Sequence, residues 1–166
     1  MAKFEEYIAQ AKSNITFLDE VDNSIPNYWD WKVTTAFYIG VHLVNAHLKH
    51  TLGYTYRTHK EVENAINFAN PTSLGKVTED VYVAYSIISK LSRRSRYIIH
   101  EKDPKTDVVC LTYDRHFKKS LIHLNTLLEF VSNEYKVEFE PIHIDCIELQ
   151  KVNLKYFKYK KLAATG

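Results

Sequence analysis

The decapeptide LSRRSRYIIH, residues 91–100, holds the side chains of this chain that are best suited to phosphate chemistry. It carries three arginines and ends in a histidine, whose ordinary pKa lies near neutral pH. On an α-helix, at about 100° per residue, Arg93, Arg96 and His100 fall within about 60° of one another and away from the apolar stripe. Arg94 is rotated by about 100° from Arg93, toward the edge of the core.

Such a face has the parts needed to cleave RNA without a metal. One group must take the proton of the ribose 2′-OH, another must protonate the leaving 5′ oxygen, and a cation must stabilise the phosphorane. His100 suits the base or acid role, and an arginine suits the phosphorane, because its planar donors match phosphate oxygens. One chain supplies one such histidine, so a two-fold dimer would complete the site. The alternative is a solvated basic face that interacts favourably with the C-terminal end of its helix.

The composition predicts a soluble globular protein with one domain. The chain has 166 residues, of which 45% are hydrophobic and 25% are charged. The net charge of +2 is too small to indicate nucleic-acid binding, so that case depends on local clusters. No secretory signal or membrane-spanning run is visible, and we expect Cys110 and Cys146 to be reduced in the cytoplasm.

Metal and cofactor chemistry finds little support in the sequence. The eight histidines are scattered, and no HExxH motif or Cys/His quartet is present. His47 and His50 are three residues apart, but no second cluster completes a metal site. The Gly-rich phosphate loops and the nucleophile elbow are absent as well. We therefore expect neither a metal nor a cofactor.

Apolar periodicity predicts four long amphipathic helices and one short helix. The first helix runs from Lys3 to about Glu20, and the second runs from Asn27 or Tyr28 to Leu52. The short third helix starts from an N-cap at Thr58 and ends at Asn70 at the latest. The fourth runs from Thr78 to the break at Asp103-Pro104, and the fifth runs from a cap at Asp114 through Val131. The second is apolar on more than one side, so it should be the most buried, and Ala36 and Gly40 would allow close helix approach. The expected fold is mainly α, an up-down four- or five-helix bundle with left-handed packing, over residues 1–135.

Residues 136–166 have a different pattern and form a basic C-terminal extension. Polar and apolar residues alternate around Pro141, which favours short strands and allows a β-hairpin. Asp145 and Glu148 resemble a capping box, however, and the apolar spacing that follows also fits a helix. Five lysines lie between Lys151 and Lys161 with no acid among them. Such a run is usually a solvated terminus, and less often a contact for RNA or a partner.

Several short motifs of the chain resemble those of the HEPN domain (higher eukaryote and prokaryote nucleotide-binding). The order and spacing of the matching residues cover most of positions 3–135. The matching residues are Trp29-Asp30-Trp31-Lys32, Ala36-Phe37-Tyr38, His42-Leu43, Thr58-His59, Leu91-Ser92-Arg93 and Arg96-Tyr97.

This resemblance implies a four- or five-helix bundle, commonly dimeric, from a superfamily rich in metal-independent endoribonucleases. Those enzymes carry an R-x(4–6)-H motif at the dimer interface and occur in toxin–antitoxin, anti-phage and CRISPR-associated systems. Both Arg93 and Arg94 fit the motif with His100, and helix geometry favours Arg93 as the catalytic partner. The implied partners are RNA or a nucleotide, a second copy of the chain, and an antitoxin or effector protein. Other HEPN domains bind nucleotides or proteins without cleaving RNA.

Four further residues are candidates for contacting the RNA or nucleotide. The candidates are Arg94, Arg96, Tyr97 and His59. His59 and Tyr97 also have structural interpretations, because a histidine beside Thr58 can order a helix start and a tyrosine can serve packing.

Overall fold

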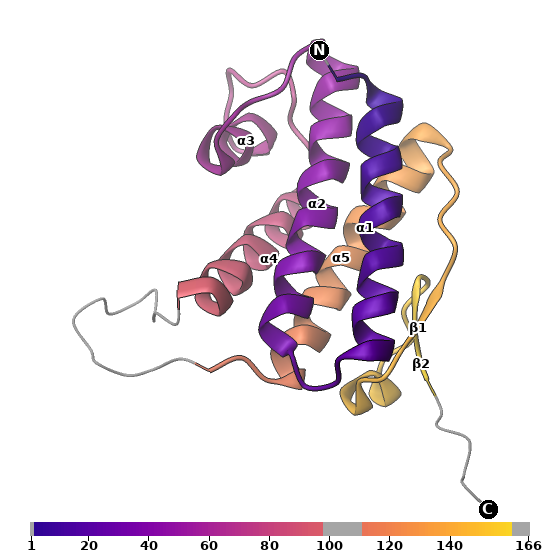
Figure 1. The fold of residues 1–166 in the computed structure, drawn as a ribbon. Coiled ribbons are helices and arrows are strands. Elements are labelled where there is room, and N and C mark those ends of the chain that lie inside the picture. Colours follow the sequence, from indigo (N-terminus) through magenta and orange to yellow (C-terminus); the bar gives the residue numbers. More distant parts are fainter. Residues whose placement is uncertain (1, 98–110, 161–166) are drawn as a thin grey trace, which may run out of the picture.

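The computed structural model describes residues 2–97 and 111–160, and within these ranges it is mainly helical, as predicted (Figure 1). The helices are α1 (Phe4–Ser24), α2 (Trp29–Leu52), α3 (His59–Ile66), α4 (Glu79–Tyr97) and α5 (Asp114–Tyr135). They are followed by strand β1 (Ile142–Ile144), the 3₁₀ helix η1 (Ile147–Lys151) and strand β2 (Phe157–Tyr159). The break at Asp103-Pro104 and the candidate catalytic His100 lie outside the described residues.

Helix α2 lies at the centre of the bundle and contacts α1, α3, α4 and α5. Its apolar residues point in several directions, so it can be covered on most sides, as the sequence predicts. A Cβ atom on Gly40 would lie 3.0 Å from Cδ1 of Leu127, so the absence of a side chain brings α2 close to α5. Gly53 ends the helix with φ of 77°, a left-handed conformation that glycine adopts without strain.

Two predicted helix boundaries are wrong, one by four residues and one by a single residue. Helix α1 continues to Ser24, because Asp22 is buried at an ion pair. Helix α3 begins as predicted, with Thr58 and Glu61 in a capping box, and it ends at Ile66, within the predicted limit of Asn70. There Asn67 leaves the helical region and its side chain accepts a hydrogen bond from the backbone N–H of Ala69. Helix α5 has Tyr113, not Asp114, as its N-cap.

The two strands of the C-terminal segment form a parallel pair, so the predicted hairpin is wrong. Ile142 aligns with Phe157 and Ile144 aligns with Tyr159. A connection of about a dozen residues joins them, which is the length that a parallel pairing needs and a tight turn cannot supply. The helical alternative is partly correct, because η1 lies in this connection, although its N-cap is Cys146 rather than Asp145.

The C-terminal segment packs against the bundle and shares its hydrophobic core. Strand β1 contacts α1, and η1 contacts α5. Its buried apolar residues are Phe139, Ile144, Cys146, Leu149, Leu154, Tyr156 and Phe157. Among the described lysines of the segment, Lys151 and Lys155 are exposed, and Lys158 and Lys160 are half-buried.

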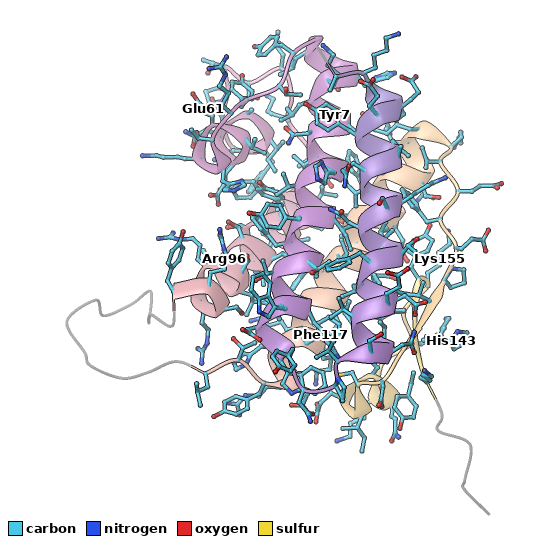
Figure 2. The ribbon with its side chains drawn as sticks, viewed as in Figure 1. Tyr7, Glu61, Arg96, Phe117, His143 and Lys155 are labelled. Atoms are coloured by element: carbon cyan, nitrogen blue, oxygen red, sulfur yellow. The ribbon has the colours of Figure 1, made fainter. Side chains whose placement is uncertain are left out.

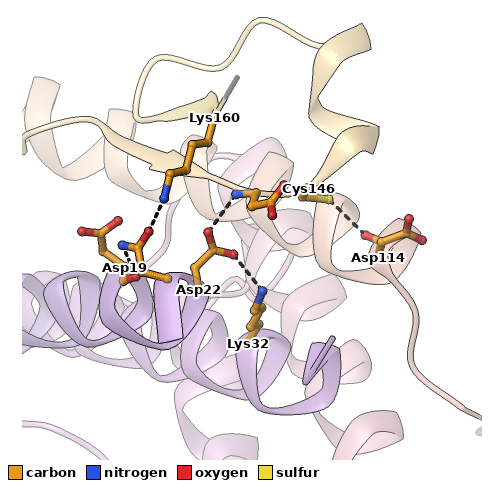
Figure 3. A network of polar contacts seen from close by, with 8 residues as sticks. Asp19, Asp22, Lys32, Asp114, Cys146 and Lys160 are labelled. Atoms are coloured by element: carbon orange, nitrogen blue, oxygen red, sulfur yellow. Dashed lines mark hydrogen bonds and ion pairs between the residues drawn. The ribbon is translucent and has the colours of Figure 1, made fainter. Parts of the chain in front are cut away.

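A buried ion pair connects this segment to the first two helices (Figure 3). The Lys32 ammonium lies 2.8 Å from Oδ1 of Asp22, and the two side chains are 1% and 0% exposed. The other carboxylate oxygen of Asp22 accepts a hydrogen bond of 2.7 Å from the backbone N–H of Asp145. One carboxylate therefore holds the end of α1, the start of α2 and the chain after β1 together.

Candidate functional site

The three arginines of the decapeptide lie on the last turns of α4 and differ in their surroundings. Arg93 is exposed, whereas Arg94 and Arg96 are half-buried. Arg94 donates a hydrogen bond from Nη2 to the carbonyl of Leu111, 3.3 Å away, just before α5. Arg96 donates from Nε to the carbonyl of Ser92 at 3.4 Å. Arg93 and Arg96 thus present guanidinium groups along one end of α4, and Arg94 is used to connect α4 to the chain before α5.

Arg96 belongs to a cluster that combines α2, α3 and α4 (Figure 2). Its guanidinium carbon lies 5.8 Å from the centre of the buried Phe37 ring and 5.3 Å from the centre of the Tyr97 ring. His59 meets the same Phe37 ring edge-on, with 4.9 Å between ring centres. The structure therefore brings Arg96 and His59 together at the Phe37 ring and places the Tyr97 ring against the guanidinium of Arg96, although His59 lies far from the other two in the sequence.

His59 is the titratable group of this cluster. Its partial burial, and next the positive charge of Arg96, lower the pKa of His59 from its ordinary value of 6.5. The imidazole is therefore mainly neutral at pH 7, with a lone pair that can accept a proton or a hydrogen bond. A neutral imidazole beside a guanidinium can bind a phosphodiester and polarise a neighbouring hydroxyl.

Removing the charge of Arg96 should raise the pKa of His59. In Arg96→Ala the protonated imidazole no longer faces a nearby cation, so protonation becomes more favourable. We expect an NMR titration of the ring protons to show the His59 midpoint at higher pH in the variant than in the wild type. His123 is the internal control, because its pKa is lowered by burial and by Lys119 rather than by Arg96. An unchanged His59 midpoint, or an equal shift of His123, would contradict this electrostatic coupling.

The aromatic rings near this cluster divide into packing residues and exposed residues. Phe37 is fully buried, which agrees with a packing role, and Trp29 is half-buried. Tyr97 is 60% exposed and lies beside Arg96, so it is the ring of the cluster best placed to stack on a base. Tyr38 and Trp31 are also exposed on α2.

The described part of the basic C-terminal segment, up to Lys160, lies away from this site (Figure 2). Figure 2 shows Lys155 and His143 on the opposite side of the bundle from Arg96. Lys155 lies instead over the ring of Tyr156, 4.9 Å from its centre. Any contact that these lysines make with RNA would therefore be separate from the α4 face.

His47 of α2 has structural partners on both ring nitrogens. Nδ1 of His47 lies 2.6 Å from the hydroxyl of Tyr135, and its Nε2 lies 3.0 Å from the carbonyl of Gly75. Both ring nitrogens are occupied, and burial lowers the pKa of His47. Within residues 2–97 and 111–160, no three His, Cys, Asp or Glu side chains come together as metal ligands.

The sequence analysis missed a second basic cluster, at the start of α5. Arg115, His116 and Lys119 lie there beside Tyr113 and close to Arg94 of α4. The signal was the string YDRHFKK, which places basic residues on the first turns of a helix. This string lies near the decapeptide because the chain returns to α4 in the folded protein. The spacing of residues along the sequence does not show that return.

Comparisons with protein-family models, with curated proteins and with solved structures find no match to this chain. The HEPN resemblance therefore depends on the motifs quoted above. None of the helices in the described ranges has the length and apolar character needed to span a membrane.

Proposed function

We propose that the chain is a HEPN-type RNA-binding protein that acts as a metal-independent endoribonuclease. The observation that carries the proposal is the cluster in which the Arg96 guanidinium and the His59 imidazole meet the Phe37 ring and the Tyr97 ring lies against the same guanidinium, near the exposed Arg93. It combines a permanent cation, a neutral imidazole and an exposed aromatic ring, which are the groups that single-stranded RNA requires. The protein would act in the cytoplasm, in a toxin–antitoxin or anti-phage system with an antitoxin or effector as its partner.

In this proposal the arginines and histidines have distinct roles. Arg93 stabilises the phosphorane, and His100 is the general base or acid of the cleavage step. Arg96 binds a neighbouring phosphate and Tyr97 stacks on a base, while His59 accepts a hydrogen bond from the RNA. Two copies of the chain form a homodimer, so that the second copy supplies the histidine that one copy lacks. Attack by the 2′-OH leaves a 2′,3′-cyclic phosphate and a free 5′-hydroxyl.

The test is cleavage of labelled single-stranded RNA in the presence of EDTA. We expect the wild type to release products that end in a 2′,3′-cyclic phosphate, and His100→Ala to be at least about 100-fold slower, the usual contribution of a general acid or base. Arg93→Ala should also be slower, while both variants still bind the RNA. Analytical ultracentrifugation should show a dimer for all three proteins.

Lys90→Ala is the matched control, because Lys90 is an exposed cation on the same helix. It should cleave at the wild-type rate. No cleavage by the wild type, or equal rates in the wild type and His100→Ala, would refute the endoribonuclease. If the wild type cleaves RNA but its products do not end in a 2′,3′-cyclic phosphate, the role of the 2′-OH as the attacking group would be refuted.

Nucleotide binding without cleavage is the second candidate function. The exposed Tyr97 ring beside the Arg96 guanidinium favours it, because a base and a phosphate of one nucleotide can occupy these two groups together. Titration calorimetry with AMP, GMP, CMP and UMP would test it. Binding that Arg96→Ala and Tyr97→Ala both weaken, together with intact RNA in the cleavage assay, would favour this function over the nuclease.

A further inference from the structure

The start of α5 carries a basic and aromatic surface built from two helices. The Arg115 guanidinium carbon lies 5.3 Å from the centre of the Tyr113 ring, and the His116 ring lies 5.9 Å from it at an angle of 31°. The Tyr113 backbone N–H donates to Nδ1 of His116 at 3.0 Å, so the position of this imidazole is fixed. Tyr113 is 45% exposed, which leaves its ring accessible from solvent.

This surface is positive, and its cations lack counter-ions within the described chain. Across residues 2–97 and 111–160, no carboxylate forms an ion pair with Arg94, Arg115 or Lys119, whereas the neighbouring Lys118 binds Glu148 at 2.7 Å. The Nε atom of Arg94 is buried and has no hydrogen-bond partner there. A buried donor without an acceptor is costly, so the Arg94 guanidinium is incompletely satisfied by the described residues.

His116 reports the strength of this positive field. Burial lowers its pKa, and Arg94, Arg115 and Lys119 lower it further, while among the described residues Asp114 acts in the opposite direction. A phosphate placed among the same groups would reverse the sign of the local field and favour the protonated imidazole.

Two hydrogen bonds fix this surface to the end of α4. Ser95 and Thr112 share one between their hydroxyl groups at 2.9 Å, and Arg94 reaches the carbonyl of Leu111. The end of α4, which carries Arg93 and Arg96, therefore lies beside the start of α5, with Arg94 between the two (Figure 2).

We infer that Arg94, Tyr113, Arg115, His116 and Lys119 form a second contact site for single-stranded RNA, which continues the strand beyond the α4 face. This site rests on the proposed RNA-binding function and extends it. The cations bind backbone phosphates and Tyr113 stacks on a base, which is the usual combination in sequence-tolerant binding of single strands. The binding site thus spans several nucleotides rather than one scissile phosphate.

Fluorescence anisotropy with a labelled single-stranded RNA of mixed sequence tests the site. We expect Arg115→Ala/Lys119→Ala to weaken binding at least tenfold at low salt, and to reduce the slope of log K against log salt by about 1.4, or 0.7 per lost phosphate contact. Lys151→Ala/Lys155→Ala is the matched control, since it removes two exposed cations from the C-terminal segment and should leave affinity and slope unchanged. Circular dichroism and thermal melting would show that each variant is folded.

A parallel Arg93→Ala/Arg96→Ala variant separates this inference from the proposed function. Weaker binding in that variant alone, with Arg115→Ala/Lys119→Ala equal to the control, would overturn the second site and leave the proposed function standing. Weaker binding in Arg115→Ala/Lys119→Ala alone would support the second site and remove RNA binding from the α4 face. A wild type that binds no RNA would overturn both.

Two further measurements, the affinity of a Tyr113 variant and the titration midpoint of His116, would not change through general electrostatic attraction. Tyr113→Ala should weaken binding of single-stranded RNA at least fivefold and leave binding of inorganic polyphosphate unaltered, because only RNA has bases to stack. The NMR titration midpoint of His116 should move to higher pH when RNA is added. Equal losses for RNA and polyphosphate, or an unmoved His116 midpoint, would overturn the assignment of these two residues.

Discussion

Replacing Asp22 with alanine should lower the free energy of unfolding by about 3–5 kcal/mol, the usual cost of leaving one partner of a buried ion pair alone. The Lys32 ammonium would lose its only carboxylate in the described chain. It would retain the faces of Trp29 and Phe117, 4.5 and 5.7 Å from the ring centres, which compensate only partly for a buried charge. The backbone N–H of Asp145 would lose its acceptor as well.

Urea unfolding followed by circular dichroism measures this effect, with Glu20→Ala as the control. Glu20 is an exposed carboxylate on the same helix, and its loss should change the free energy of unfolding by no more than about 0.5 kcal/mol. Equal costs for the two variants would show that the Asp22–Lys32 pair contributes little to stability.

A double variant separates the charge from the hydrogen bond. In Asp22→Asn/Lys32→Met the buried charges are gone, and the amide oxygen at position 22 can still accept from Asp145. We expect this variant to be more stable than Asp22→Ala, because no isolated buried charge remains and the backbone N–H of Asp145 keeps its acceptor. A double variant that is less stable than Asp22→Ala would contradict this account.

Helices α1 and α5 were predictable because each buries one periodic stripe of apolar residues. The stripe Phe4, Ile8, Ala11, Ile15, Leu18 of α1 and the stripe Phe117, Leu121, Leu124, Leu128, Val131 of α5 face the core as their spacing indicates. Local signals such as Gly53 and the Thr58 capping box also act within one turn of the chain, so sequence alone reveals them.

The Asp22–Lys32 pair was not predicted, although the sequence contained a signal for it. Lys32 lies on the same stripe of α2 as Ala36, Ile39 and Leu43, where a charge needs a buried partner. The predicted end of the first helix, at about Glu20, leaves Asp22 outside the helix, because the partner of Asp22 lies on the next helix. A signal that depends on two elements meeting in space cannot be obtained from the period of either one.

The candidate site was predicted only in part, because some of its contacts also depend on elements that meet in space. Helix geometry separates Arg93 and Arg96 from Arg94, and the structure has Arg94 half-buried against Leu111. The approach of His59 to Arg96 through Phe37 depends on how α3 packs beside α2 and α4. No spacing along the chain encodes that approach, and the same holds for the cluster around Tyr113.

The chain shortened to residues 1–135 should lose cooperative unfolding and expose apolar surface. The C-terminal segment buries large side chains such as Tyr156 and Phe157, and full burial of each is worth about 1.5–3 kcal/mol. Without it, the apolar faces of α1 and α5 that it covers meet water. The side chains of Asp22 and Asn125, which accept backbone hydrogen bonds from Asp145 and Tyr156, lose those partners. These losses are comparable with the whole stability of a small domain, about 5–15 kcal/mol.

Thermal melting and binding of a hydrophobic dye distinguish the outcomes, with the chain shortened to residues 1–160 as the control. The control keeps every buried side chain named here and should melt as the full chain does. Phe157→Ala gives a graded version of the same test, with an expected loss of about 3–5 kcal/mol against no loss for Lys151→Ala. If residues 1–135 melt cooperatively at the temperature of the full chain, the bundle is an independent domain and the segment is an appendage. If they do not, the segment is part of the bundle core, and its lysines are surface charges of the same folded unit.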